Sequence, residues 1–174
     1  VGNAKYDSRE HCHALVETAS NTLIEGCKNT TIPNSITSIG NEAFFYCTGL
    51  TSVIIPNSVT SIGDNAFNGC SALDTVICKA IVPPMPGTLP FGSISPTAVL
   101  FVPYESIDAY KAISEYVSKF YVIEGFSFVE DITEESAVLK WIPDTAVTQY
   151  KIDVYQNTTH IAHYEVDGNG HVIS

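Results

Sequence analysis

The sequence His11-Cys12-His13 holds the side chains most typical of a metal site. On a strand, alternate residues face the same side, so the two imidazoles could meet one ion while Cys12 points away. A zinc site needs three or four convergent ligands, and neither Glu10 nor Glu17 lies at a diagnostic spacing from this pair. We therefore interpret the histidines as solvated strand residues and expect no metal and no cofactor.

The serines do not form a recognisable nucleophile. Four of them recur at one spacing, which is typical of turn and hydrogen-bonding positions: Ser35, Ser38, Ser58 and Ser61. The sequence has no G-x-S-x-G elbow, no glycine-rich phosphate loop and no C-x-x-C pair. Because no set of nucleophile, base and oxyanion donors can be assembled, we expect that the protein is not an enzyme.

The composition narrows the class of partner. The 174 residues include 19 acidic and 8 basic side chains, which gives a net charge of −11, and 45% of the residues are hydrophobic. This content is enough for a buried core, and the negative charge disfavours nucleic acids and anionic membranes. No apolar run approaches the roughly 20 residues of a membrane helix, and Val1-Gly2-Asn3 does not begin a signal peptide. We expect no membrane insertion, and either a cytosolic protein or one whose targeting segment has been removed.

An internal repeat organises the middle of the chain. The sequence of residues 32–40 returns at residues 55–63 with one change, Ile36 to Val59, a shift of 23 residues (from 32 to 55). Six further identical pairs continue the match through the whole unit: Ala43/Ala66, Phe44/Phe67, Cys47/Cys70, Leu50/Leu73, Val53/Val76 and Ile54/Ile77. A repeat of this length predicts stacked structural units that share one core.

Each unit contains the spacing L-x-x-L-x-L, which predicts a short strand whose inward side chains form one layer of the core. Two layers are regular and two outer layers are degenerate, as expected for terminal coils: Leu50, Val53, Ile55; Leu73, Val76, Cys78; Cys27, Thr30, Ile32; and Thr97, Leu100, Val102. The sequence therefore predicts about four coils.

The motif I-P-N-S-V-T-S-I-G-D-N-A-F-x-x-C-x-x-L-x-x-V, which ends at Val76, resembles the BspA-type leucine-rich repeats in surface proteins of host-associated bacteria. The resemblance covers roughly residues 20–124. It implies a mainly β fold with minor α structure, a leucine-rich-repeat solenoid that is extracellular and serves adhesion and protein recognition. It implies no reaction.

The register of the repeat suggests the state of the cysteines. Cys47 and Cys70 occupy the same position in successive coils, Cys27 replaces Leu50, and Cys78 replaces Ile55. Because free cysteine behaves as a small buried hydrophobe, we favour buried thiols. Coils about 5 Å apart would also allow a bridge between Cys47 and Cys70, so that alternative stays open.

Both ends of the array have sequences suited to a cap. Apolar runs at 14–17 and 22–25 flank a polar turn, which predicts a β-hairpin over the first coil. After the last coil, Ser106 is a plausible N-cap for one helix whose apolar stripe would close the core: Ile107, Tyr110, Ile113, Tyr116 and Phe120. A partner-binding role for this helix is the less favoured alternative. The first domain is expected over residues 1–124.

Residues 125–174 lose the repeat and show the alternation of half-buried strands at 136–141 and 149–155. These two segments resemble the second and third strands of a fibronectin type III domain, with 128–133 as the first. About 50 residues is half of such a sandwich, so we expect a truncated or smaller β-sandwich-like module. Its uncovered strands could support self-association.

Outward positions of the repeat strands form the candidate binding surface. The predicted binding strip consists of Ser52, Ile54, Thr75, Ile77, Val99 and Phe101, with Asn29 and Thr31 at the same positions of the first coil. A hairpin, helix or neighbouring chain covering Ile54 and Ile77 is an equally weighted alternative.

The predicted function is a secreted or cell-surface module that binds a host or matrix protein, in a bacterial protein whose signal or anchor segment lies outside this chain. The alternative is a structural spacer in a larger surface protein. A glycan-binding module ranks lower, because the strip has one aromatic residue.

Overall fold

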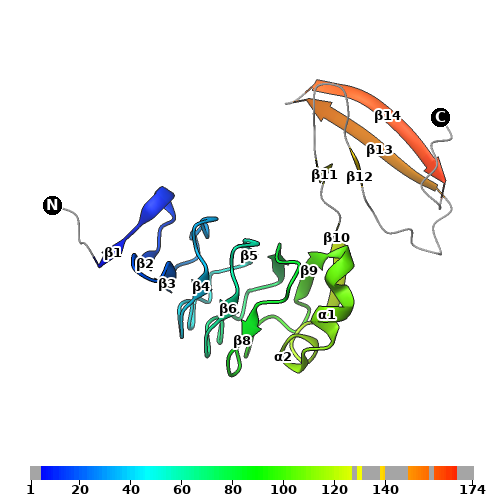
Figure 1. Ribbon diagram of the computed structural model, residues 1–174. Helices are drawn as coiled ribbons and strands as arrows, with labels where there is room; N and C mark the ends of the chain where they lie inside the picture. Colours follow the sequence, from blue (N-terminus) through cyan, green and yellow to red (C-terminus); the bar gives the residue numbers. More distant parts are fainter. Residues whose placement is uncertain (1–4, 127–128, 131–137, 140–148, 157–158, 168–174) are drawn as a thin grey trace. The chain divides into compact units, whose positions relative to one another are not determined.

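The computed structural model describes residues 5–126, 129–130, 138–139, 149–156 and 159–167 (Figure 1). The chain divides into two compact units, Val1–Phe128 and Val129–Ser174. The domain boundary expected after residue 124 falls inside strand β10 (Val122–Phe126), which pairs with a strand of the first unit.

One sheet of the first unit runs from the hairpin into the repeats. Its strands are β1 (Tyr6–Asp7), β2 (Leu15–Glu17), β3 (Thr22–Glu25), β4 (Ser38–Ile39), β6 (Ser61–Ile62) and β8 (Met85–Pro86), in that spatial order. β1, β2 and β3 pair antiparallel, which confirms the predicted hairpin, and the later pairs are parallel. The hairpin therefore continues the repeat sheet at its N-terminal end.

The second sheet contains the L-x-x-L-x-L strands. It is made of β5 (Ser52–Ile55), β7 (Thr75–Cys78), β9 (Val99–Pro103) and β10, all parallel, in the order β10-β9-β7-β5. Val53 lies opposite Val76, and Val76 lies opposite Leu100. Because each pairing joins equivalent residues of successive units, the repeat period read from the sequence is the spacing of the coils.

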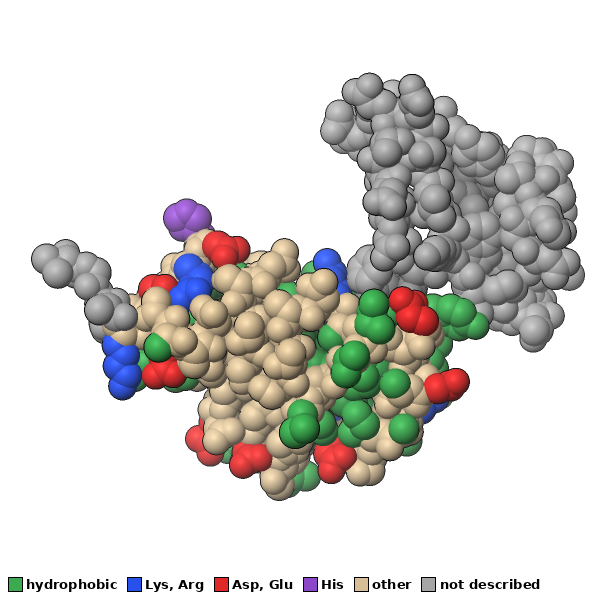
Figure 2. All heavy atoms as spheres, in the orientation of Figure 1, with side chains coloured by type: hydrophobic (Ala, Val, Ile, Leu, Met, Phe, Trp, Pro, Cys, Tyr) green, Lys and Arg blue, Asp and Glu red, His purple; other side chains and the backbone are tan. Residues whose placement is uncertain are grey.

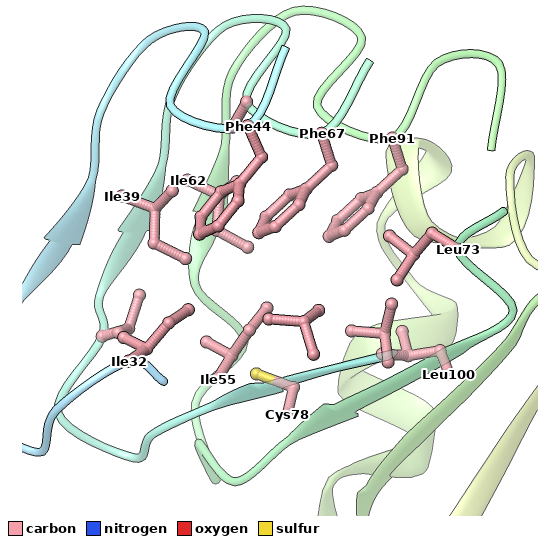
Figure 3. Packing of buried hydrophobic residues seen from close by; sticks show 14 of the residues in the cluster. Ile32, Ile39, Phe44, Ile55, Ile62, Phe67, Leu73, Cys78, Phe91 and Leu100 are labelled. Atoms are coloured by element: carbon pink, nitrogen blue, oxygen red, sulfur yellow. The ribbon is translucent and has the colours of Figure 1, made fainter. Parts of the chain in front are cut away.

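The core between the two sheets is built from columns of equivalent side chains (Figure 3). The rings of Phe44 and Phe67 stack with centroids 4.8 Å apart, and those of Phe67 and Phe91 with centroids 5.1 Å apart. Ile39 and Ile62 lie side by side in the same way. All five side chains are at most 1% exposed, so each coil buries its apolar residues against the next coil rather than within itself.

Glycines at the turns after β4, β6 and β8 let these coils approach closely. A Cβ atom on Gly63 would lie 2.5 Å from the backbone nitrogen of Asn41. The side chain of Asn41 accepts a hydrogen bond from the backbone N–H of Asp64 at 2.9 Å, and Asp64 accepts one from the N–H of Thr88 at 2.6 Å. The polar residues after the first two of these glycines, Asn41 and Asp64, thus tie their turns to the next coil.

The C-terminal cap differs from the single helix expected. It consists of the 3-10 turn η2 (Tyr104–Ser106) and the short helices α1 (Ile107–Lys111) and α2 (Ser114–Val117), separated where Ile113 is extended at φ −103°, ψ 116°. Ser106 occupies the N-cap position of α1 as expected, but its side chain makes no capping hydrogen bond.

The cap nevertheless buries the apolar stripe. The ring of Phe120 meets the last ring of the phenylalanine column, Phe91, edge-on at 5.0 Å, and Tyr116 lies at 6.1 Å from it. The Tyr110 hydroxyl donates to the carbonyl of Ala80 at 2.8 Å, and that of Tyr116 donates to the carbonyl of Pro84 at 2.7 Å. These contacts close the C-terminal end of the core.

The second unit contains two antiparallel pairs among its described residues. β11 (Val129–Glu130) pairs with β12 (Val138–Leu139), and β13 (Gln149–Gln156) pairs with β14 (Thr159–Asp167). Strands therefore occur within each of the three segments expected to form them, and β14 was not expected. The remainder of those segments lies outside the described residues.

Candidate functional site

The strip predicted from the sequence lies on the outward face of the second sheet. Successive side chains of a strand point to opposite faces, and in β5 this alternation is clear: Val53 and Ile55 are buried, whereas Ser52 and Ile54 are exposed. β7 repeats the pattern at equivalent positions. The side chains that hold the coils together and those that face outward therefore come from the same short strands.

Parallel pairing brings the six residues of the strip into two columns. Ser52, Thr75 and Val99 are aligned in one column, and Ile54, Ile77 and Phe101 in the other. Ile54 is 50% exposed at the end of its column, and Ile77 and Phe101 are half-buried because they have strands on both sides. The structure thus brings all six predicted residues together on one face.

The sequence interpretation missed that β10 extends both columns. Val122 pairs with Val99, and Glu124 pairs with Phe101, so the apolar column ends at a carboxylate. A signal was present, because Phe120-x-x-Ile123 repeats the Leu50-x-x-Val53 spacing and both residues are buried. The two intervening helices hid it from a search for consecutive coils.

The two outer layers of the predicted core need correction. In the first coil, Cys27 is exposed and Thr30 is half-buried, and the segment forms no strand beside β5, so Asn29 and Thr31 do not extend the columns. In the fourth, Thr97 is exposed and Ala98 is fully buried in its place. Thr30 and Thr97 carry polar side chains, which kept these two residues out of the core.

The capping elements leave Ile54 open. The hydroxyl of Tyr110 in α1 reaches Cys78, whose side chain is buried in the core, at 3.1 Å, so this helix packs on the inner side of the sheet. Apolar side chains are also exposed elsewhere, at Ile81, Val82 and Met85 next to and within β8 (Figure 2). That second group lies beside and within β8 of the other sheet and was not part of the predicted site.

The five cysteines are all free thiols in this structure. Cys12, Cys70 and Cys78 are buried, Cys47 is half-buried and Cys27 is exposed. The prediction of a buried thiol holds for Cys70 and Cys78 and fails for Cys27. Burial raises the pKa of Cys70 to about 11, and its thiol donates a hydrogen bond to the carbonyl of Phe44 at 3.0 Å. A thiol with a raised pKa is a poor nucleophile, which suits a packing role.

The histidine cluster does not have the geometry expected of it. Residues Arg9–His11 form a 3-10 turn rather than a strand, and His11 and His13 both have positive φ angles and exposed side chains. Cys12, expected to point away from the two imidazoles, is fully buried in the core. Within the part of the chain that the structure describes, no three His, Cys, Asp or Glu side chains are placed to hold a metal ion.

Comparison with known families finds a match within the repeats. Residues 21–83 match the family model described as BspA type Leucine rich repeat region (6 copies). Repeats of this BspA type are generally non-enzymatic and mediate protein–protein interaction, and the proteins that carry them are usually secreted or at the cell surface. Neither a curated protein nor a solved structure matches the chain, and the resemblance of residues 125–174 to fibronectin type III finds no support.

The BspA-type match covers β3 to the segment before β8, and therefore two of the three strands that carry the binding strip. No helix among the described residues has the length and apolar character needed to cross a membrane.

Proposed function

We propose that the chain is a protein-binding module of a secreted or cell-surface bacterial protein, and that its partner docks on the binding strip formed by Ser52, Ile54, Thr75, Ile77, Val99 and Phe101. The observation that carries the proposal is the alignment of Ile54, Ile77 and Phe101 across three hydrogen-bonded strands, which makes a continuous apolar column on an outward face. Contiguous outward apolar side chains on a repeat protein are typical of a contact surface.

The physical character of the strip suits protein recognition. The backbone of its strands is fixed by the sheet and by the core beneath it, so little ordering entropy opposes binding. An apolar column flanked by small polar residues such as Ser52 and Thr75 offers both dispersion contacts and hydrogen bonds. With a net charge of −11, the chain associates faster with a neutral or basic partner surface than with an acidic one. A matrix or host surface protein of that character is the proposed partner.

The test is binding to a panel of immobilised matrix proteins and glycans, measured by surface plasmon resonance. The strip variant is Ile54→Asp, Ile77→Asp, Phe101→Asp. The matched control is Ile81→Asp, Val82→Asp, Met85→Asp, which places the same three charges on exposed apolar residues beside and within β8 of the other sheet. Circular dichroism melting checks that each variant folds.

The expected result is saturable binding to at least one protein of the panel, lost in the strip variant and kept in the control. Because Ile77 and Phe101 are half-buried, their replacement by aspartate can also disturb folding. A second strip variant, Ser52→Arg, Thr75→Arg, therefore places two bulky charged side chains in the polar column of the same face. Binding that survives both strip variants would place the contact elsewhere. No binding by folded wild type to any member would favour a structural spacer.

A further inference from the structure

Strand β5 forms an open edge of the second sheet. It is the last strand in the order β10-β9-β7-β5. The carbonyl of Thr51 accepts hydrogen bonds from the N–H groups of Asp74 and Thr75, and that of Ile55 accepts one from Lys79. Alternate residues of a strand turn their backbone groups to opposite neighbours. Ser52 and Ile54 therefore direct their N–H and C=O groups away from β7.

The first coil does not cover this edge. By the 23-residue shift, residues 28–32 hold the place of a strand beside β5, yet they form no strand there. The N–H of Thr30 instead closes a turn with the carbonyl of Cys27 at 3.0 Å, and the N–H of Thr31 bonds to the carbonyl of Cys12 at 3.1 Å. Among the described residues, no backbone hydrogen bond joins 28–32 to β5.

A groove takes the place of the missing strand pairing. It has a volume of about 440 Å³ and is lined on one side by residues 30–34 and on the other by Ser52, Val53, Ile54 and Pro56. Glu10 and Lys79 also line it. This volume lies within the range of ligand-binding clefts in proteins. Because the first coil walls the groove, a single extended chain can enter it more readily than the edge of a second packed sheet.

We propose that this edge binds an extended segment of a partner protein, which adds to the sheet as a parallel strand beside β5. The backbone of Ser52 and Ile54 would supply two donors and two acceptors, as in other cases of strand addition. The proposal concerns the backbone edge, whereas the proposed function concerns the outward side chains of the strip, so either can fail alone.

The repeat indicates which segment fits. β5 and β7 carry equivalent residues at their outward and inward positions, Ser52/Thr75, Val53/Val76 and Ile54/Ile77. A strand with the sequence of β5 can therefore meet β5 as β5 itself meets β7. We therefore expect a partner segment with successive branched apolar residues. One of these side chains would extend the apolar column of Ile54, Ile77 and Phe101 beyond Ile54. Given the net charge of −11, a segment with neutral or basic flanks is favoured.

The test uses the full chain and a fluorescein-labelled synthetic peptide with the sequence of residues 50–57, Leu-Thr-Ser-Val-Ile-Ile-Pro-Asn, extended by two lysines. Binding is followed by fluorescence anisotropy. The variant Ser52→Pro removes one edge N–H that has no partner within the described chain, and proline is tolerated at such edges. The matched control Ser52→Thr keeps the N–H and the strand propensity.

Wild type and Ser52→Thr should bind the peptide alike, and Ser52→Pro should bind at least about tenfold more weakly, the loss that corresponds to one hydrogen bond of about 1.4 kcal/mol. A peptide N-methylated at its Val and second Ile should also lose binding, because these residues would donate to β5. N-methylation at its Ser and first Ile should not weaken it. The methylated pair decides the question even if Ser52→Pro does not fold.

Two results would overturn the proposal. One is no peptide binding by folded wild type. The other is binding that is insensitive to Ser52→Pro and to both methylation patterns. If such insensitive binding is lost in Phe101→Asp, the peptide lies on the binding strip, which would support the proposed function while refuting the edge site.

Discussion

The central phenylalanine of the core column offers the sharpest test of how the coils are held together. Phe67 is fully buried, and its ring stacks on Phe44 at 4.8 Å and on Phe91 at 5.1 Å, with interplanar angles of 9° and 2°. Truncation of a buried phenylalanine to alanine costs about 3–5 kcal/mol. Because Phe67→Ala removes two ring contacts at once, we expect a loss near 5 kcal/mol.

A matched variant at the end of the column isolates the contribution of stacking. Phe44 is equally buried but has one stacked ring, and its other side lies against Gly26, where a Cβ atom would collide with the ring. An aromatic pair contributes about 0.5–1.5 kcal/mol beyond its buried area. Phe44→Ala should therefore destabilise the chain by about 1 kcal/mol less than Phe67→Ala.

Urea unfolding followed by far-UV circular dichroism measures both losses. The fluorescence of Trp141, the single tryptophan, would not serve, because it belongs to the second unit. Hydrogen exchange of peptides covering residues 60–92 should show the loss of protection centred on the middle coil. Equal losses for Phe67→Ala and Phe44→Ala, or a loss under about 2 kcal/mol at Phe67, would refute the view that adjacent coils are coupled mainly through this column.

The regular coils were predictable because their residues repeat. Residues 32–40 and 55–63 differ only at Ile36/Val59, which predicts that equivalent side chains stack, and the structure pairs Ser38 with Ser61 and joins their hydroxyls at 2.8 Å. The same argument located the outward residues of the binding strip, since alternation along a strand and the repeat shift together determine their neighbours. Their partners and their use cannot be read from periodicity.

The ends of the array were less predictable because long-range contacts decide them. The stripe from Ile107 to Phe120 fits one helix, but the hydroxyls of Tyr110 and Tyr116 bond to two different carbonyls, of Ala80 and Pro84, and Ile113 is extended between them. In the first coil, a bond from the N–H of Thr31 to Cys12 replaces pairing with β5. No local pattern in the sequence predicts either contact.

Three further variants probe the buried polar groups. Tyr110→Phe leaves the carbonyl of Ala80 without its donor, so the urea midpoint should fall by an amount equivalent to about 1–2 kcal/mol, and an unchanged midpoint would contradict the 2.8 Å bond. Ser106→Ala removes a buried hydroxyl that has no hydrogen-bond partner among the described atoms, so stability in the same titration should stay equal or rise by up to about 1 kcal/mol; a fall would reveal a missed partner. At Cys70, burial raises the thiol pKa from its ordinary value of 9.0 to about 11, so the native state keeps its proton where the unfolded chain has lost one. The free energy of unfolding should therefore be insensitive to this group below pH 9 and fall between pH 9 and 11 by at most about 1.4 kcal/mol per pH unit. Burial also raises the pKa of Cys78 and Tyr110, so their titration contributes to the same pH range. The measurement is therefore the difference in the free energy of unfolding between wild type and Cys70→Ala, followed against pH in reducing buffer. If the two pH curves run parallel, the Cys70 thiol is not buried in the native state.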